Sequence, residues 1–234
     1  MKKENNPFEE KQIAEEWIAW VENSTPEGSR KAQIYPLVKE WLLGLDPKKV
    51  VDIGAGQGIV SEYMPSGDIE YIGVEPSKSL VDRARNLYKE KNRKFIVGNA
   101  YDLPINNDWA DAAFSVYVWM HLEDLSKASQ ELARVLRPGG GFLIITANPG
   151  TYNVWESFYS EANRDGIKIE GKVSIRGKGL SKNTLYLHPK EDILKTLEEN
   201  GLIVEEVKTF GYEEEHDDSG LHISIRGRKL EEFE

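Results

Sequence analysis

Short runs of apolar residues recur along the middle of the chain, and turn-forming residues separate them. Each run is roughly five to eight residues long, which is typical of a buried strand. Runs that stay apolar, instead of alternating with polar residues, indicate strands covered on both faces, as in a parallel sheet. The predicted strands lie at residues 49–53, 69–75, 94–98, 111–118 and 141–147.

Helical periodicity fills the gaps between these runs. Residues 77–91, for example, place Leu80, Ala84 and Leu87 on one face of a helix. Pro36 stands at the predicted start of another helix, where proline is tolerated because the first turn needs no N–H donor. The other predicted helices cover residues 8–21, 36–43, 123–137 and 189–201, and one begins at residues 59–64.

The pattern changes after residue 147. Residues 148–188 are rich in loops and glycine, and they predict a partly helical segment around 153–163 followed by a small β-ribbon. Two closing strands, 202–211 and 220–228, are expected to pair antiparallel at the sheet edge. Strands joined by crossover helices predict a doubly wound, mainly parallel sheet with helices on both faces.

Composition narrows the class of protein. The chain has 234 residues, of which 39% are apolar, enough for a sizeable core. No run reaches the ~18–20 apolar residues of a membrane helix, and no apolar segment of a secretory signal follows the amino terminus, so we expect a cytoplasmic protein. There is no cysteine, and the four histidines lack metal-ligand spacing, so we expect no metal site. A net charge of −10 disfavours nucleic acid and favours a small-molecule partner.

The turn after the first predicted strand carries three glycines in the stretch VVDIGAGQG. Gly54, Gly56 and Gly58 remove side chains where the carboxyl end of a strand meets a helix, so a ligand can lie against bare backbone. The spacing departs from the dinucleotide fingerprint G-x-G-x-x-G, because Ile59 takes the place of its last glycine. No G-K-[ST] follows, so the turn is not a phosphate loop either.

Glu75 ends the second predicted strand. A carboxylate at this place can accept hydrogen bonds from both hydroxyls of a ribose. The residue therefore indicates an adenosine-containing ligand, which is either a dinucleotide or an adenosyl compound.

Five segments in order resemble the class I S-adenosylmethionine-dependent methyltransferases, in particular the branch with quinone-biosynthesis and other small-molecule enzymes: VVDIGAGQG, YIGVEPS, FIVGNAYDLP, DAAFSVYVWMHLED and ELARVLRPGGGFLIITA. The resemblance is strong over residues 45–148. It implies a Rossmann-like fold with seven strands, the last one antiparallel, and S-adenosyl-L-methionine as cofactor. We expect a single domain, 1–234, with a helical cap at 1–44 and an inserted substrate lid at 149–188.

The resemblance also implies which residues bind the cofactor. The turn backbone passes beside its methionine part, Asp52 orients the turn or reaches the methionine amino group, and Glu75 holds the ribose. Asn99 stands where the family more often has aspartate, and its amide oxygen still accepts a hydrogen bond. The implied set is Asp52, Gly54, Ala55, Gly56, Gly58, Glu75, Pro76 and Ala100, with Asn99 at the adenine edge, the Ser115 carbonyl on the ammonium and Arg30 on the carboxylate.

Each of these residues also has an ordinary structural explanation, such as a turn glycine, a solvated carboxylate or a surface arginine. Methyl transfer releases a neutral thioether, so it needs a base only when the acceptor loses a proton. His121, just beyond the fourth predicted strand, is the candidate catalytic base. The alternative is that His121 packs or caps the next helix.

The insertion offers two further features. Its aromatic residues form either a lid over the substrate or the core of the insertion itself: Tyr152, Trp155, Phe158 and Tyr159. Its basic residues either admit an anionic substrate or phosphate group, or are a solvated ribbon edge, which we favour: Arg164, Lys168, Lys172, Arg176, Lys178 and Lys182.

Three other functions stay open. An RNA- or protein-directed methyltransferase would have the same fold, although the proline-aromatic motif of many nucleic-acid enzymes is missing after the fourth predicted strand. The glycine spacing argues against a nicotinamide-dependent oxidoreductase. A cofactor-binding protein without catalysis is the third.

Overall fold

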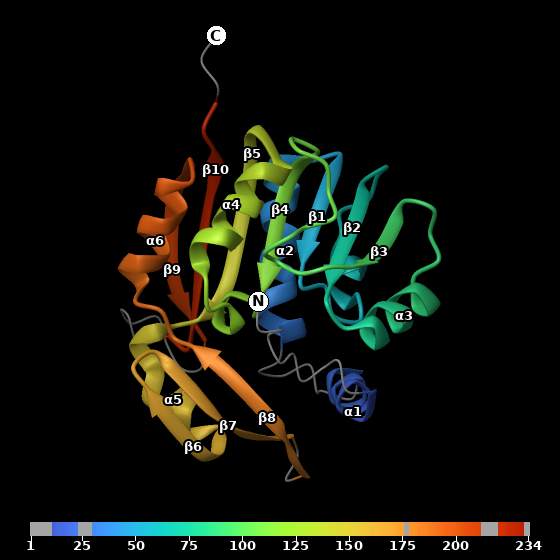
Figure 1. Cartoon of the computed structure of the whole chain (residues 1–234). Coiled ribbons are helices and arrows are strands. Elements are labelled where there is room, and N and C mark those ends of the chain that lie inside the picture. The colour runs from blue at the N-terminus through green and yellow to red at the C-terminus, as the bar shows by residue number, and fades with distance from the viewer. Residues whose placement is uncertain (1–10, 23–29, 176–177, 212–219, 232–234) are drawn as a thin grey trace.

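A computed structural model describes residues 11–22, 30–175, 178–211 and 220–231. Its largest sheet is formed by β1 (Lys49–Ile53), β2 (Glu70–Glu75), β3 (Arg93–Val97), β4 (Ala110–Val116), β5 (Leu136–Ala147), β9 (Leu202–Phe210) and β10 (His222–Lys229). The seven strands follow the order β3-β2-β1-β4-β5-β10-β9 (Figure 1). The first five run parallel, and β10 runs antiparallel to both neighbours. The predicted mainly parallel sheet with an antiparallel last strand is therefore confirmed.

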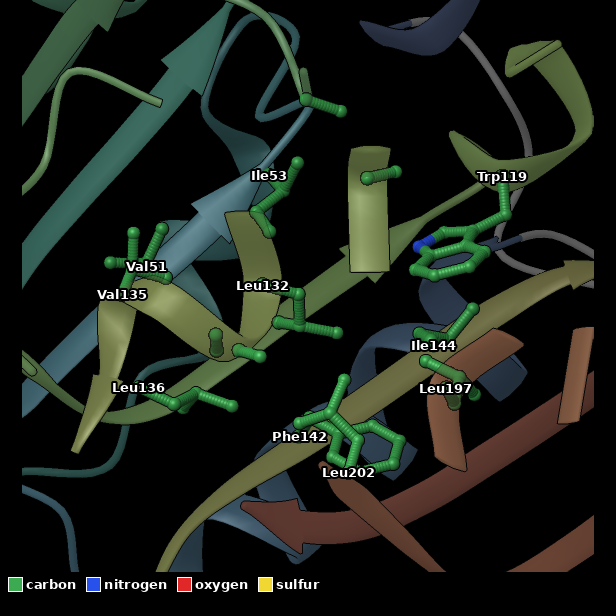
Figure 2. Packing of buried hydrophobic residues seen from close by; sticks show 14 of the residues in the cluster. Val51, Ile53, Trp119, Leu132, Val135, Leu136, Phe142, Ile144, Leu197 and Leu202 are labelled. Carbon is green, nitrogen blue, oxygen red and sulfur yellow. The ribbon is translucent and has the colours of Figure 1, made fainter. Parts of the chain in front are cut away.

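Helices cover both faces of this sheet. On one face lie α4 (Leu125–Val135) and α6 (Lys190–Glu199), and on the other lie α2 (Arg30–Leu45) and α3 (Lys78–Leu87) (Figure 1). Val51, Ile53 and Ile144 belong to the first core, where they pack with Leu132 and Leu197 from the helices (Figure 2). Neighbouring residues of the same strands point to the opposite core: Val50, Leu143 and Ile145.

Side-chain caps define where two of the helices begin. The Ser77 side chain accepts a hydrogen bond from the Leu80 N–H and starts α3, and the Asp124 carboxylate accepts one from the Lys127 N–H and starts α4. Leu87, predicted to share the buried face of Leu80, is 43% exposed because α3 ends at this residue.

Two predicted helices differ from the structure. The segment after the glycine turn is a short 3-10 helix, η2 (Ile59–Tyr63), because only a few residues separate the turn from Pro65. In α2, Pro36 lies inside the helix and not at its start. The prediction missed the first turn of α2 because that turn is polar. Residues 8–10, the first residues of another predicted helix, lie outside the described residues, and α1 is described from Lys11 to Glu22.

The insertion folds as η4 (Pro149–Thr151), α5 (Tyr152–Ser157) and a three-stranded antiparallel sheet of β6 (Tyr159–Asp165), β7 (Lys168–Ile175) and β8 (Lys178–Tyr186). We call residues 149–188 the lid segment. It lies at the end of the main sheet toward which β4 points (Figure 1). The predicted helix around 153–163 is wrong beyond residue 157, since Tyr159 pairs with Val173 in the small sheet. No helix among the described ranges is long and apolar enough to cross a membrane.

Candidate functional site

The glycine turn joins β1 to η2 at the carboxyl end of the sheet. Gly54, Gly56 and Gly58 all have positive φ, at 76°, 56° and 84°, a region that favours glycine. A Cβ added at Gly54 would overlap the side chain of Val118, and one added at Gly58 would overlap the Phe95 ring. A Cβ at Gly56 would meet nothing within 4 Å. The turn is therefore packed at both ends and open in its middle.

Glu75 connects the glycine turn to the start of α3. One carboxylate oxygen, Oε2, accepts from the Gly56 N–H at 3.1 Å, and the other, Oε1, accepts from the Ser77 N–H at 2.9 Å. Burial raises the pKa of Glu75 to about 7, and these two hydrogen bonds oppose the shift. Each oxygen keeps a second lone pair, so the carboxylate can still accept two hydrogen bonds from a ligand.

Asp52 lies beneath the same turn and is 1% exposed. Its Oδ2 accepts a hydrogen bond from the Tyr71 hydroxyl at 2.6 Å. Burial raises the pKa of Asp52 to about 7, the Tyr71 hydroxyl lowers it, and the nearby Glu75 raises it further. The hydrogen bond shown for this carboxylate therefore goes to a strand side chain. The roles that the resemblance implies for Asp52, orienting the turn or reaching the methionine amino group, stay predictions.

The residues predicted at the adenine edge follow β2 and β3. Pro76 is half-buried and Ala100 is buried, while Asn99 is exposed. Asn99 Oδ1 accepts from the Tyr101 N–H at 2.8 Å, which is the side-chain bond of an Asx turn. The side chain thus acts locally as a turn residue, and one lone pair of its oxygen remains. Ala55 is also buried, and its side chain lies toward Gly73 of β2.

Arg30, the first residue of α2, reaches the same end of the sheet. Its guanidinium lies over the ring of Trp17 at 4.8 Å and over the ring of Tyr117 at 4.6 Å, and it hydrogen-bonds Tyr35. Ser115, in β4, is 1% exposed, and its Oγ has no hydrogen-bond partner among the described residues. The structure therefore brings Arg30 and Ser115 to the glycine-turn end from distant parts of the chain.

Tyr117 and His222 form a contact that sequence reasoning missed. Tyr117 has a φ of 59°, which is strained for a non-glycine residue. Its hydroxyl lies 3.1 Å and 3.2 Å from the two ring nitrogens of His222, and its ring packs edge-on against Trp155. Burial, with Arg30 as a smaller cause, lowers the pKa of His222 to about 4. These residues are far apart in sequence, so no local pattern pointed to the pair.

Gln57, inside the glycine turn, was also missed. It is 3% exposed, and both polar atoms of its amide lack a hydrogen-bond partner within the described part of the chain. An unpartnered buried amide is costly, which marks the turn as a place where a ligand can supply hydrogen bonds. A glutamine between two glycines was visible in the sequence, but its burial was not.

His121 ends the short helix η3 (Trp119–His121), just after β4. Its Nδ1 lies 2.9 Å from the carbonyl oxygen of Thr184 in β8. Burial lowers the pKa of His121, the Thr184 hydrogen bond raises it, and Arg30 lowers it further. The ring is therefore neutral at physiological pH, and it contacts the lid segment as well as the end of the sheet.

The lid segment packs on η3 and β5 through its own small core. Met120 and Ala147 from the main fold meet Tyr159, Ile169 and Leu185. Of its other aromatic residues, Trp155 packs against this core, whereas Phe158 is 48% exposed. Tyr159 thus belongs to the core of the insertion, and Trp155 also faces Tyr117.

Several basic residues of the lid segment already have partners. Lys168 pairs with Glu170 at 2.8 Å, and Lys172 pairs with Glu161 at 2.7 Å. Arg164 lies over the Tyr152 ring at 4.2 Å. Arg176 lies outside the described residues, as do the side chains of Lys178 and Lys182. These pairings favour a solvated ribbon edge.

A cavity of about 400 Å³ lies beside the lid segment, between η4, the β6–β7 turn and the start of α6. Its lining includes Tyr152, Arg164, Leu187 and Lys190. The residues of the glycine turn do not line it, so this cavity is separate from the arrangement around Glu75.

Comparison with known proteins points to one family. Residues 51–144 match the model of a family described as a methyltransferase domain. An uncharacterized methyltransferase of Mycobacterium tuberculosis, Rv3342, is 27% identical over 141 residues, which cover 60% of this chain and 57% of that protein. The match thus spans little more than half of the relative's length. The family match at residues 51–144 lies within residues 45–148, where the five motifs predicted this family.

Two other relatives have names that specify different acceptors. Tocopherol O-methyltransferase of Arabidopsis thaliana is 36% identical over 104 residues, 42% of this chain and 30% of that protein. A tRNA (carboxymethyluridine(34)-5-O)-methyltransferase of Mus musculus is 32% identical over 148 residues, 61% of this chain and 20% of that protein. The family resemblance therefore extends to proteins with unlike acceptors.

Among solved structures, the CcbJ methyltransferase of Streptomyces caelestis superposes with a TM-score of 0.70 at 16% identity, covering 95% of this chain and 98% of that one. At this level of identity the likeness concerns the fold. It confirms the Rossmann-like methyltransferase fold predicted from the motifs.

Proposed function

Because residues 51–144 belong to the S-adenosylmethionine-dependent methyltransferases, we propose that the chain transfers a methyl group from S-adenosyl-L-methionine to a small-molecule acceptor. The observation that carries the proposal is the buried Glu75 carboxylate, which touches the glycine turn on one side and the start of α3 on the other. The family, the open turn and the carboxylate all favour an adenosyl ligand at this end of the sheet.

The residues near the turn fit the adenosine half of this cofactor. Glu75 holds the two ribose hydroxyls with the lone pairs that its backbone partners leave free. The open side of Gly56 gives the ligand a place against bare backbone. Pro76, Asn99 and Ala100 face the adenine, and Asn99 uses the remaining lone pair of its oxygen.

The methionine half fits on the other side of the turn. Arg30 binds the carboxylate, and the Ser115 carbonyl accepts from the ammonium group. Asp52 contributes negative charge beneath the turn, and the Gln57 amide gains the hydrogen-bond partners that it lacks. Each assignment is a proposal that binding measurements on single variants test.

Methyl transfer requires little of the protein beyond aligning the acceptor atom with the methyl group. When bound, S-adenosylmethionine supplies a methyl group on a sulfonium, whose departure leaves a neutral thioether. The chain has to hold the acceptor atom in line with that methyl group and exclude water from it. Trp17 and Tyr117, which both contact Arg30, and the lid segment, which packs on η3, supply the enclosing walls.

A small molecule is the favoured acceptor. The net charge is −10, and both Lys168 and Lys172 are paired with carboxylates, so the described part of the lid segment offers little free positive charge to a polyanion. The name of the plant relative agrees with such an acceptor, whereas the name of the mouse relative agrees with the RNA-directed alternative.

A transfer assay tests the proposal. Radiolabelled S-adenosylmethionine is incubated with the protein and with separated small-molecule, RNA and protein fractions of a cell extract. We expect label in the small-molecule fraction. Label confined to RNA or protein would assign the chain to the macromolecule-directed enzymes, and no transfer to any fraction by a protein that binds the cofactor would indicate a binding protein without catalysis.

A further inference from the structure

The cavity beside the lid segment has the size and the mixed lining of a small-molecule site. Its volume of about 400 Å³ falls within the roughly 300–1,000 Å³ that such sites occupy in proteins. It is bounded by the residue after β5, by η4, by the β6–β7 turn and by the first turn of α6. Because the glycine turn does not line it, a ligand here binds apart from the proposed cofactor site.

One wall of the cavity is apolar. Ile169 and Leu187 are 1% and 8% exposed, and both belong to the small core that joins the lid segment to the main fold. Two further lining residues, Tyr152 and Ile167, are open to solvent, with 36% and 38% of their surface exposed. Large apolar side chains exposed beside a cavity favour contact with the apolar body of a ligand.

Arg164 supplies a cation to the same cavity. Its Nε–H donates to the Gly166 carbonyl at 3.1 Å, and its guanidinium lies 4.2 Å from the centre of the Tyr152 ring. These two contacts hold the guanidinium in the cavity wall. Its Nη1 and Nη2 make no hydrogen bond or ion pair with any residue of the described ranges. Four N–H donors are therefore left for a ligand.

The charges around the cavity favour an anion. The described part of the lining has one acidic side chain, Glu191, and two basic ones, Arg164 and Lys190. The first turn of α6 adds to this balance, because its N-cap residue, Pro189, makes no side-chain cap and the N–H groups of a helix start attract negative charge. The cavity thus carries a small positive excess in a chain whose net charge is −10.

One class of ligand satisfies both walls. A guanidinium binds a carboxylate through two parallel hydrogen bonds, so the free Nη1 and Nη2 of Arg164 match that group. An inorganic anion leaves the apolar wall without a partner, and an uncharged apolar molecule leaves the guanidinium without one. A cationic ligand is disfavoured by the positive excess.

We propose that this cavity is a second ligand site, which binds a small organic carboxylate with an apolar body and braces the lid segment. The carboxylate pairs with Nη1 and Nη2 of Arg164, and the apolar body lies against Ile169 and Leu187. The proposal goes beyond the proposed methyl transfer and does not depend on it, because binding here requires no cofactor.

The apolar wall explains how a ligand braces the lid segment. Ile169 and Leu187 pack with Met120 of η3, and the Leu187 N–H donates to the Ile167 carbonyl at 2.8 Å, which ties the β6–β7 turn to the segment before α6. A ligand body that covers this wall excludes water from that hydrogen bond. Local opening of the lid segment then becomes rarer.

Methyl NMR with 2-naphthoate and its uncharged analogue 2-naphthamide tests the site. In the wild type, 2-naphthoate is expected to shift the methyl signals of Ile167, Ile169 and Leu187 and to bind about tenfold or more tighter than 2-naphthamide. Saturating S-adenosylhomocysteine should not displace it. Shifts confined to other methyl groups, or displacement by S-adenosylhomocysteine, would overturn the site, and equal affinities for the two probes would overturn the role of the charge.

Three variants locate the binding energy. Arg164→Gln should lower the affinity for 2-naphthoate about tenfold or more and leave that for 2-naphthamide unchanged. Lys172→Gln is the matched control, because Lys172 is a lid cation that pairs with Glu161 and does not line the cavity, and it should bind both probes as the wild type does. Ile167→Trp fills the open side of the cavity and should weaken both probes.

Two results would contradict the assignment of the residues. One is an equal loss of 2-naphthoate affinity in Arg164→Gln and Lys172→Gln, and the other is unchanged binding of both probes in a folded Ile167→Trp. Hydrogen exchange tests the bracing separately. Bound 2-naphthoate should slow exchange of the Leu187 N–H by about threefold or more, and an unchanged rate would show that the ligand does not brace the lid segment.

Discussion

Asp52 and Glu75 are the acidic side chains buried beneath the glycine turn, and burial raises the pKa of each to about 7. A folded-state pKa above the unfolded value means that ionising the group at neutral pH costs folding free energy. A ligand that donates hydrogen bonds to the carboxylates offsets this cost. We infer that the two acids are kept for binding and not for stability.

The pH dependence of binding follows from the Glu75 carboxylate. It accepts from ribose hydroxyls fully only when ionised, so protonation below its pKa of about 7 should weaken binding. The affinity for S-adenosylhomocysteine should rise by about tenfold between pH 6 and pH 8, as calorimetry can measure. Glu75→Gln should flatten this profile, and an unchanged slope in that variant would exclude Glu75 as its source.

Alanine variants at Gly56 and Gly166 separate the cost of backbone strain from the loss of contact with the ligand. Its φ is 56°, and Gly166 in the lid segment has a φ of 58°; a Cβ at either position meets nothing within 4 Å. Each alanine variant should lose about 1–2 kcal/mol in the free energy of unfolding, because both backbones are left-handed. Only Gly56→Ala should also lose affinity for S-adenosylhomocysteine, by about tenfold or more, because its Cβ enters the proposed ligand space. Equal affinities in the two variants would contradict this placement.

At the scale of elements, apolar runs predicted the strands of the main sheet well, because β1, β4 and β5 are buried on both faces. The pattern failed at β6, where every residue after Tyr159 is exposed and no apolar alternation exists to be read. It also failed at α2, whose buried Ile34 and Tyr35 precede Pro36, because packing there outweighs the missing hydrogen bond of the proline.

In the candidate site, too, the sequence predicted the local features and missed the long-range contacts. The glycine turn and Glu75 were visible because they are local features of β1 and β2. The contacts of Tyr117 with His222 and of His121 with Thr184 join elements 105 and 63 residues apart. Only the folded chain brings such pairs together, so composition and motif spacing do not predict these contacts.

The contact of Tyr117, just after β4, with His222 in β10 predicts that the free energy of unfolding falls in acid. The pKa of His222 falls from 6.5 to about 4 in the fold, so the unfolded chain takes up a proton first as the pH drops. The stability from neutral His222 is thus full above pH 6.5 and is lost as the pH falls toward 4. The wild type should lose about 2 kcal/mol at this site between pH 7 and pH 5.

His222→Phe removes this titration while keeping an aromatic ring beside Tyr117. Urea denaturation at pH 7 and pH 5 should therefore show a smaller acid-induced loss of unfolding free energy in the variant than in the wild type. The m-values of the two proteins should agree, so that the difference reports stability. An identical loss in both proteins would show that His222 is protonated in the folded state at pH 5.

At the scale of the whole molecule, the proposed cofactor site lies at the carboxyl ends of β1, β2 and β4, where open parallel sheets bind their ligands. α1 and the start of α2 approach this edge through Trp17 and Arg30, and the lid segment approaches it through Trp155 and Thr184. We therefore propose that the parts of the chain that carry no family motif enclose the acceptor side.

Titration calorimetry of the wild type, Glu75→Ala and Glu70→Ala with S-adenosylhomocysteine and with NAD tests the central claim most directly. Glu70 is an exposed carboxylate at the other end of β2, which makes it the matched control. We predict micromolar binding of S-adenosylhomocysteine by the wild type and Glu70→Ala, a loss of about tenfold or more in Glu75→Ala, and no binding of NAD. A folded wild type that ignores S-adenosylhomocysteine, or that prefers NAD, would contradict the account.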